Sequence, residues 1–346
     1  MDDAALVLDF LKHKELNQGR AAGTVDVYHA QLQRLISFLE ERQRGLLSAT
    51  SDDLREFVGL HLHQRGVAPR SRKPAVSAVR QMYRYLKERG LVSEDPAGRI
   101  EYPKLARRLP KAMHRRHVEA LFQQTDVKTL KGIRDAAIIS VLVGCGLRVA
   151  GVVSLNQSNV VSDVDEDGRE LAILHVREKG GHERVLPVPD DVLLLIRAYL
   201  GHEDLEAINR ELPDGDQVLF VNLRNRNIPA HEHYGERRRL STNSIRAMLM
   251  DYGLKAGIPK AYLHPHAARH LFGVELAEGE IDLHVRSALM GHRSSESTKL
   301  YERMSLRRLR RALETAGPLR HIRTPVSGLR ELLNRQARKP AARNPR

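Results

Sequence analysis

Apolar side chains recur at helical spacing over the first hundred residues and predict four amphipathic helices. The second is expected to begin at Thr24, and its apolar positions fall on one face. Thr50 and Asp53 have the spacing of a capping box and predict the start of the third helix. The fourth is expected to begin at Ser71 and to end at Gly90. This part of the chain is therefore predicted to form a small helical domain.

A proline-containing break follows at residues 95–110, which is typical of a linker and predicts a domain boundary near residue 110. Two short strands, joined by a glycine-containing turn, are predicted at 171–176 and 184–188, and a further strand at 218–221. The remaining periodicity predicts helices near 115–124, 132–145, 190–200, 242–256, 265–279, 282–290 and 305–315. The stretch 201–240 is polar and loop-rich, as in a surface insertion.

The predicted fold class is mainly α with a small β-sheet. A four-helix N-terminal domain is expected at 1–109, an α+β domain at 110–304, and a basic C-terminal helix and tail at 305–346. A chain of 346 residues is long enough for two such domains.

The charge of the chain indicates a polyanionic partner. Lys and Arg number 57 against 43 Asp and Glu, a net charge of +14. The excess is uneven, because residues 1–109 carry +5, residues 110–304 carry −1, and residues 305–346 carry +10. We therefore expect the two ends of the chain to contribute most to the binding of nucleic acid. A solvated, disordered terminus is the alternative for the tail.

A cluster of basic residues on the fourth predicted helix indicates where the phosphates would lie. Between residues 66 and 90 there are seven basic side chains and one acidic one. We expect double-stranded DNA to contact this helix through its cations, although a solvated helical face would show the same pattern. The candidate DNA-binding residues are Arg70, Arg72, Lys73, Arg80, Arg84 and Lys87.

Several classes of protein are excluded. The mean hydropathy is −0.43, and the longest nearly apolar run, residues 136–146, is too short to span a bilayer. The first residues lack the features of a signal peptide, and the single cysteine, Cys145, permits no internal disulfide and no cysteine zinc site. His231 and His233 lack identifiable further ligands, so no metal is expected. A cytoplasmic protein with no membrane partner is predicted.

Candidate chemistry lies in four local settings. Arg148 follows a glycine turn at the end of an apolar helix, and Lys179 lies at the tip of the predicted hairpin. His266 and Arg269 are three residues apart at a helix start and share one face. His292 follows a glycine and precedes Tyr301 by nine residues. Each residue alone has an ordinary structural explanation as a cap, an exposed tip or a packed side chain.

Taken together and in this order, these six residues make the chain resemble the tyrosine recombinase family of lambda-type integrases and Xer recombinases. The resemblance covers residues 112–304 closely, and the N-terminal helices look like the core-binding domain of the family. It implies that Tyr301 is the nucleophile and that Lys179 protonates the leaving 5′-oxygen. It also implies that His266 assists proton movement at the tyrosine and that His292 hydrogen-bonds the phosphate.

Physical chemistry agrees with this assignment. Cleavage of a phosphodiester without metal requires cations beside the non-bridging oxygens, and Arg148 and Arg269 supply two guanidinium forks. A tyrosine can stay attached to the phosphate and be displaced again, so the bond energy is kept. Neither ATP nor a metal ion is then needed, and no cofactor is predicted.

Some positions depart from the family pattern. Gly151 stands two residues after Val149, where the family commonly has a glutamate; it weakens the local helix and removes a carboxylate near Arg148. Ala268 stands where a leucine is usual, and the sequence around Lys179 also differs from the common one. None of the six candidate catalytic residues is lost, so an active enzyme is predicted.

The resemblance implies a site-specific recombinase that exchanges DNA strands through a 3′-phosphotyrosyl intermediate and a Holliday junction. A homo-tetramer on synapsed DNA and a nucleoid-associated location are implied as well. The reaction would serve DNA integration or excision, or replicon resolution; the insertion and the basic tail favour a mobile element. The alternatives are a DNA-relaxing enzyme of the type IB topoisomerase kind and a catalytically silent DNA-binding accessory protein.

Overall fold

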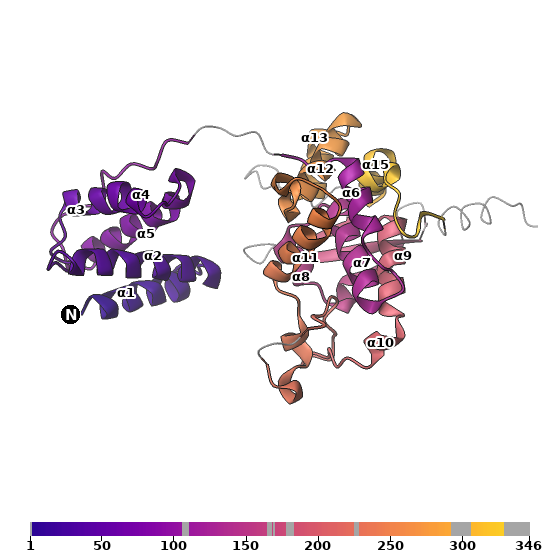
Figure 1. Cartoon of the computed structure of the whole chain (residues 1–346), viewed down its shortest axis with the longest axis horizontal. Coiled ribbons are helices and arrows are strands. Elements are labelled where there is room, and N and C mark those ends of the chain that lie inside the picture. Colours follow the sequence, from indigo (N-terminus) through magenta and orange to yellow (C-terminus); the bar gives the residue numbers. More distant parts are fainter. Residues whose placement is uncertain are drawn as a thin grey trace, which may run out of the picture. The chain divides into compact units, whose positions relative to one another are not determined.

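The structure is a computed structural model of the chain, and it describes residues 2–105, 111–164, 168, 170–177, 183–224, 228–291 and 306–328. The chain divides into two compact units, Met1–Arg108 and Leu109–Arg346 (Figure 1). Each unit has a hydrophobic core of its own. The mostly helical chain with one small sheet confirms the predicted fold class.

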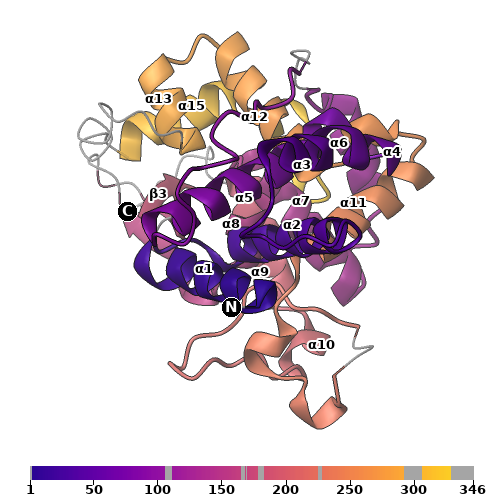
Figure 2. The same cartoon turned by 90° about the vertical axis from the view of Figure 1, so that its left-hand side faces the viewer.

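The first unit is entirely helical over its described residues. Its elements are α1 (Asp3–Lys12), the π-helical turn η1 (His13–Asn17), α2 (Ala22–Glu40), α3 (Ser51–Glu56), the π-helical turn η2 (Phe57–His61), α4 (Leu62–Gln64) and α5 (Pro69–Glu88). Because α3, η2 and α4 follow one another without a break, they form the third predicted helix. The α2 and α5 helices pack against each other beside α1 (Figure 2).

The first residues of the helices in this unit can be compared with the predicted caps. The capping box of Thr50 and Asp53 is present, which confirms that prediction. The prediction that Thr24 opens the second helix is wrong, because α2 begins at Ala22. The fourth helix begins two residues before Ser71, at Pro69, since proline is well suited to the first helical turn. Aromatic side chains fill the core below these helices, among them Phe10, Phe38, Phe57 and Tyr83.

The second unit is built around α7 (Leu130–Gly144), which is buried from Gly132 to Gly144. It packs against α8 (Val149–Val153), α9 (Asp190–Leu200) and α12 (Pro265–Glu278). The other α-helices among the described residues are α6 (Arg115–Gln123), α10 (Glu203–Glu206), α11 (Thr242–Lys255), α13 (Leu283–Met290) and α15 (Leu306–Ala316). A helix surrounded by other elements is mostly apolar, which explains the nearly apolar run at 136–146; the buried Arg134 and Asp135 of α7 form a salt bridge.

A three-stranded antiparallel sheet lies in this unit, in the order β1 (Val160–Val164), β2 (Glu170–Arg177), β3 (Glu183–Pro187). The β1 strand was not predicted from the sequence, because four of its five residues are exposed and it lacks the alternation that marks a half-buried strand. The prediction of a strand at 218–221 is wrong. Val218 and Val221 instead form isolated bridges with Asn156 and Arg239.

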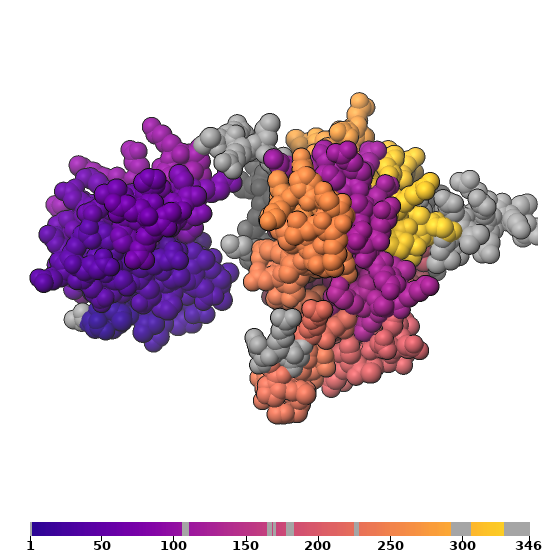
Figure 3. Space-filling view, in the orientation of Figure 1, coloured from indigo at the N-terminus to yellow at the C-terminus, as the bar shows by residue number. Residues whose placement is uncertain are grey.

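The segment after α15 belongs to the core of the second unit. The 3-10 turn η7 (Pro318–His321) places Leu319 against α7, where a Cβ on Gly144 would lie 2.6 Å from the Leu319 side chain. The Thr324 hydroxyl donates to the buried Asp191 carboxylate over 2.6 Å. Figure 3 shows the yellow surface of α15 and of this segment beside the magenta surface of α6 and α7.

No helix in the part of the chain that the structure describes has both the length and the apolar character needed to cross a bilayer.

Candidate active site

The first candidate residue, Arg148, is placed by a sharp turn at the end of α7. Gly146 takes the left-handed conformation with φ +58°, and Arg148 then occupies the N-cap position of α8. Its side chain is half-buried and reaches α13, where Nη2 donates to the Gly291 carbonyl over 3.4 Å. The turn therefore directs the guanidinium toward the C-terminal end of another helix.

The turn at Gly146 requires glycine for two reasons. A positive φ strains any residue with a Cβ, and a Cβ here would lie only 2.3 Å from the Phe272 ring on α12. The Gly146 carbonyl also accepts a hydrogen bond from Arg269 Nη1 over 2.6 Å. The absence of a side chain at Gly146 thus lets the Arg148 turn approach α12 closely.

Arg269 lies on α12 and connects three segments. Its side chain is only 5% exposed, and it donates to the carbonyls of Gly146 and Met290. The helix begins beside it, because His264 at the N-cap accepts from the Ala267 amide over 3.0 Å. A buried guanidinium costs little only when its donors are satisfied, and backbone carbonyls supply acceptors here.

His266 is exposed on the same first turn of α12. Its pKa lies below the usual value because neighbouring protein replaces part of its water and because His270, Arg269, His264 and Arg148 add positive potential. The imidazole is therefore neutral near pH 7 and has a free ring nitrogen to accept a proton.

The C-terminal end of α13 is where these cations converge. Its carbonyls at Ala288 and Leu289 accept from Arg184, while Met290 and Gly291 accept from Arg269 and Arg148. Gly291 has φ +58° and ends the helix, and its amide donates to the Ser287 and Ala288 carbonyls of the last turn. A helix C-terminus carries partial negative charge and attracts cations.

Arg184, at the start of β3, is the member of this group that the sequence did not reveal. It is one of many arginines in the chain, and its local sequence has no feature that distinguishes it. Only the tertiary fold brings β3 close enough to the end of α13 for Arg184 to donate to the carbonyls of Ala288 and Leu289.

The structure thus brings together Arg148, His266 and Arg269 from segments more than a hundred residues apart. The other three candidate residues, Lys179, His292 and Tyr301, lie outside the described residues. Their roles stay predictions. In the sequence, His292 follows directly after Gly291.

The candidate DNA-binding residues all lie on α5. Arg70, Lys73, Arg84 and Lys87 are exposed and share one face of the helix, because their spacings are close to whole turns. Arg72 and Arg80 are half-buried. Arg72 donates to the Val67 and Gly59 carbonyls, and Arg80 donates to the Ile100 carbonyl and lies over the Tyr102 ring.

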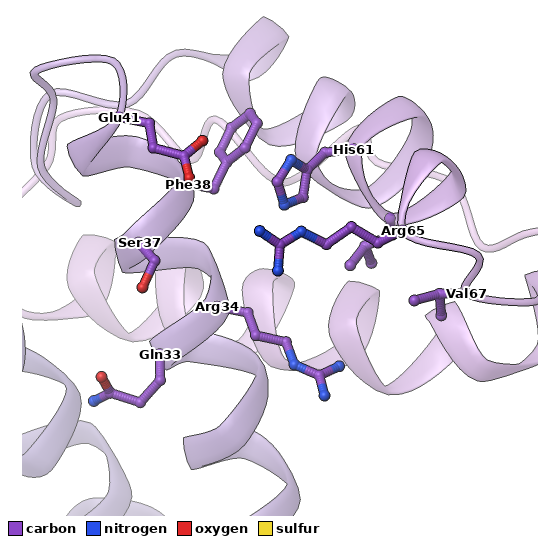
Figure 4. A pocket seen from close by; sticks show the side chains of 9 residues that line it. Gln33, Arg34, Ser37, Phe38, Glu41, His61, Arg65 and Val67 are labelled. Carbon is purple, nitrogen blue, oxygen red and sulfur yellow. The ribbon is translucent and has the colours of Figure 1, made fainter.

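Two other features lie apart from these residues. A cavity of about 350 Å³ opens between α2 and α4, and Figure 4 shows Arg34, Phe38, His61 and Arg65 around it. Burial and the nearby Arg65 lower the pKa of His61.

At the second feature, the His231–His233 stretch, His233 is buried and its pKa is lowered by that burial. Within the described ranges, no three His, Cys, Asp or Glu residues form a group that could hold a metal ion.

Comparison with known proteins agrees with this geometry. Residues 111–307 match the model of the phage integrase family, and residues 7–90 match the N-terminal SAM-like domain of phage integrases. The tyrosine recombinase XerD of Rhizobium meliloti (strain 1021) is 31% identical over 323 residues, which cover 91% of this chain and 96% of the relative. The tyrosine recombinase XerC of Myxococcus xanthus is 31% identical over 316 residues, covering 90% and 97%.

Two solved structures share the fold. The XerH site-specific recombinase in a post-cleavage complex on palindromic difH has a TM-score of 0.62 at 14% identity, and the match covers 90% of this chain and 84% of that one. The lambda integrase tetramer on a Holliday junction has a TM-score of 0.58 at 15% identity, covering 86% and 76%.

These matches show that the chain belongs to the phage integrase family, as the resemblance implied. It is a tyrosine recombinase that breaks and rejoins DNA at specific sites. The relaxing enzyme and the silent accessory protein considered as alternatives are not favoured.

The depressed pKa of His266 predicts how its protonation depends on pH. A His whose pKa is lowered stays neutral until the pH falls below the usual value of about 6.5. We therefore expect an NMR titration of the His266 ring to show a midpoint below 6.5, with the resonance assigned from a His266→Gln variant. A midpoint at or above that value would contradict the prediction.

The close approach at Gly146 predicts a large cost for any side chain there. In Gly146→Ala, the strain of the positive φ and the overlap with Phe272 should together lower the free energy of unfolding of the second unit by more than about 2 kcal/mol. The matched control is Gly257→Ala, which has φ +70° but open space around it and should cost about 1 kcal/mol. Urea denaturation measures the free energy of unfolding of both variants. Equal losses in the two variants would contradict a contribution from overlap with Phe272.

Proposed function

We propose that Arg148 and Arg269 hold the scissile phosphate of DNA while Tyr301 attacks it. The observation that carries this proposal is the convergence of the two guanidinium groups on the neighbouring carbonyls of Met290 and Gly291, beside the neutral His266. Two guanidinium groups placed side by side match the two non-bridging oxygens of a phosphodiester. Their charge is most useful as negative charge builds up in the transition state.

The chemical step transfers the phosphoryl group without consuming energy. The Tyr301 oxygen gives its proton to His266 and forms a bond to phosphorus, and the bond from phosphorus to the 5′-oxygen breaks. Lys179 protonates the leaving 5′-oxygen, and His292 hydrogen-bonds a non-bridging oxygen. Attack by the 5′-hydroxyl of another strand then displaces the tyrosine and reverses these proton transfers.

We assign DNA binding to the exposed face of α5. Arg70, Lys73, Arg84 and Lys87 can all reach a duplex that lies along this face, which supports phosphate contacts that are independent of base sequence. Arg72 and Arg80 belong to the same candidate set, and their protein contacts orient them. The domain at 1–109 then binds DNA, that at 110–304 performs the chemistry, and the basic segment 305–346 adds to the affinity.

The proposal extends to the oligomeric state of the protein and to its location in the cell. A homo-tetramer on two synapsed DNA sites is supported by the lambda integrase tetramer on a Holliday junction, which has the same fold. Double-stranded DNA is the partner, and the cytoplasmic nucleoid is the place where a bacterial enzyme of this kind meets it. The relatives include both XerC and XerD at equal identity, so we infer a role in DNA integration, excision or replicon resolution without choosing a subtype.

The nucleophile can be tested by trapping the covalent intermediate. Incubating the protein with a pool of random duplexes, each carrying a nick, should yield a covalent adduct, because release of the short strand next to the nick prevents religation. Tyr301→Phe should yield none, since the hydroxyl that attacks phosphorus is gone. Denaturing gels detect the adduct, and sequencing the captured DNA defines the recognised site.

An adduct that persists in Tyr301→Phe would show that another residue is the nucleophile. The absence of any adduct with the unaltered protein would contradict the proposed cleavage step. Adding EDTA serves as a further control, because a mechanism based on arginines is expected to keep its rate without divalent metal.

The α5 surface predicts a change in the salt dependence of binding. Removing one cation that touches a phosphate should reduce the slope of log affinity against log salt concentration by about 0.9. The double variant Lys73→Gln, Lys87→Gln is therefore expected to reduce it by about two. The matched control, Lys12→Gln with Arg55→Gln, removes two exposed charges from other helices of the same unit and should leave the slope unchanged. Equal changes of the slope in both variants would show that the salt dependence reflects net charge alone and not contacts made by α5.

A further inference from the structure

The Arg239 side chain makes an unusually complete set of contacts. Nη1 donates to the carbonyls of Val153 over 2.9 Å and Leu155 over 3.0 Å. Nη2 donates to Asn156 Oδ1 over 2.7 Å and to Glu236 Oε2 over 2.8 Å, and Nε donates to Glu236 Oε1 over 2.7 Å. All five N–H donors of the guanidinium thus have an acceptor.

These contacts fix the end of α8 opposite Arg148. The helix spans only Val149–Val153. Ser154 and Leu155 donate to its Ala150, Gly151 and Val152 carbonyls, and the Val153 carbonyl accepts from Arg239. Arg239 supplies donors to the Val153 carbonyl and to the chain immediately after it. A cation at this end is also favoured by the partial negative charge of the helix C-terminus.

Arg239 is itself held by the core of the unit. Its backbone pairs with Val221 in an isolated bridge, and the Leu240 amide donates to the Phe220 carbonyl over 3.2 Å. The Val221 carbonyl in turn accepts from Arg134 of α7 over 2.8 Å. The contacts made by Arg239 therefore connect α8 to the buried central helix.

The α8 helix needs this support because of its length and composition. A single short turn is not stable alone, and Gly151 in its middle has the poorest helix propensity after proline. A glutamate is common at this position in the family that the sequence resembles. Arg148 caps the other end of the helix, so any tilt of α8 displaces the guanidinium from Gly291.

We propose that Arg239 is a positioning residue for the recombination reaction: by holding the C-terminal end of α8, it keeps Arg148 in place beside the scissile phosphate. This inference rests on the proposed role of Arg148. It assigns a function in the reaction to the segment 201–240. The prediction that this segment is a surface insertion is wrong in part, because residues 218–221 are buried in the core. Arginine is needed because the three donors of a lysine ammonium cannot serve all of these acceptors.

The test uses the DNA site captured from the pool of nicked duplexes, in two forms. One form has the ordinary scissile phosphate, and the other has a methylphosphonate there, which lacks one non-bridging charge. We expect Arg239→Gln to slow adduct formation about 10- to 100-fold on the phosphate, because a small misplacement of a catalytic group has effects of this size. On the methylphosphonate the loss should be under about threefold, since less charge remains to be neutralised.

Three further variants complete the experiment, and every rate is taken at saturating DNA relative to the unaltered protein on the same substrate. Arg148→Gln should show the same substrate-dependent loss. Arg237→Gln is the matched control, because this arginine is exposed in the 3-10 turn just before Arg239 and pairs with Glu232; its rates should stay unchanged. Glu236→Ala, whose side chain is 64% exposed, loosens Arg239 without removing it and should give a smaller loss of the same kind.

Equal losses on both substrates in Arg239→Gln, or no loss on either, would overturn the proposal. If thermal melting shows that Arg239→Gln does not fold, the same comparison in Glu236→Ala decides. A loss in Arg148→Gln that does not depend on the substrate would instead overturn the proposed role of Arg148, which separates the two failures.

Discussion

The hydrogen bonds from arginine side chains to the last carbonyls of α13 are the interaction on which the candidate site depends. Arg148, Arg184 and Arg269 come from a loop, a strand and a helix, and each donates to carbonyls between Ala288 and Gly291. A helix terminus is one of the few places in a fold where several adjacent carbonyls lack partners. It therefore gathers cations into a small volume by means of acceptors that carry no formal charge.

Other arginines of this chain form ion pairs with carboxylates. Arg115 pairs with the buried Glu275, Arg134 with the fully buried Asp135, and Arg239 with Glu236. In such pairs the carboxylate balances the guanidinium charge, as suits a structural role. The carbonyls of Gly146, Met290 and Gly291 orient Arg269 and Arg148 at the end of α13, which suits groups proposed to hold a phosphate.

The local sequence predicted much of the fold and singled out three residues of the candidate site. Helical periodicity located the longer helices but not the short α8 and α10, and the Thr50 capping box was correct. It missed β1, whose exposed side chains show no alternation, and it placed the start of α2 two residues late. It identified Arg148, His266 and Arg269 because they stand in distinctive local settings, but not Arg184 or Arg239, whose settings are ordinary. Contacts between residues about a hundred positions apart leave no local pattern in a single sequence.

The sequence by itself determined the helical character of the chain, the uneven distribution of its charge, the family to which it belongs and the order of its candidate catalytic residues. These properties depend on residue type and short spacing, which a linear chain displays directly. Only the tertiary structure decided which arginines share the end of α13 and how the short α8 is held. Those outcomes depend on which carbonyls remain unpaired after the helices have packed, and unpaired carbonyls exist only in the folded chain.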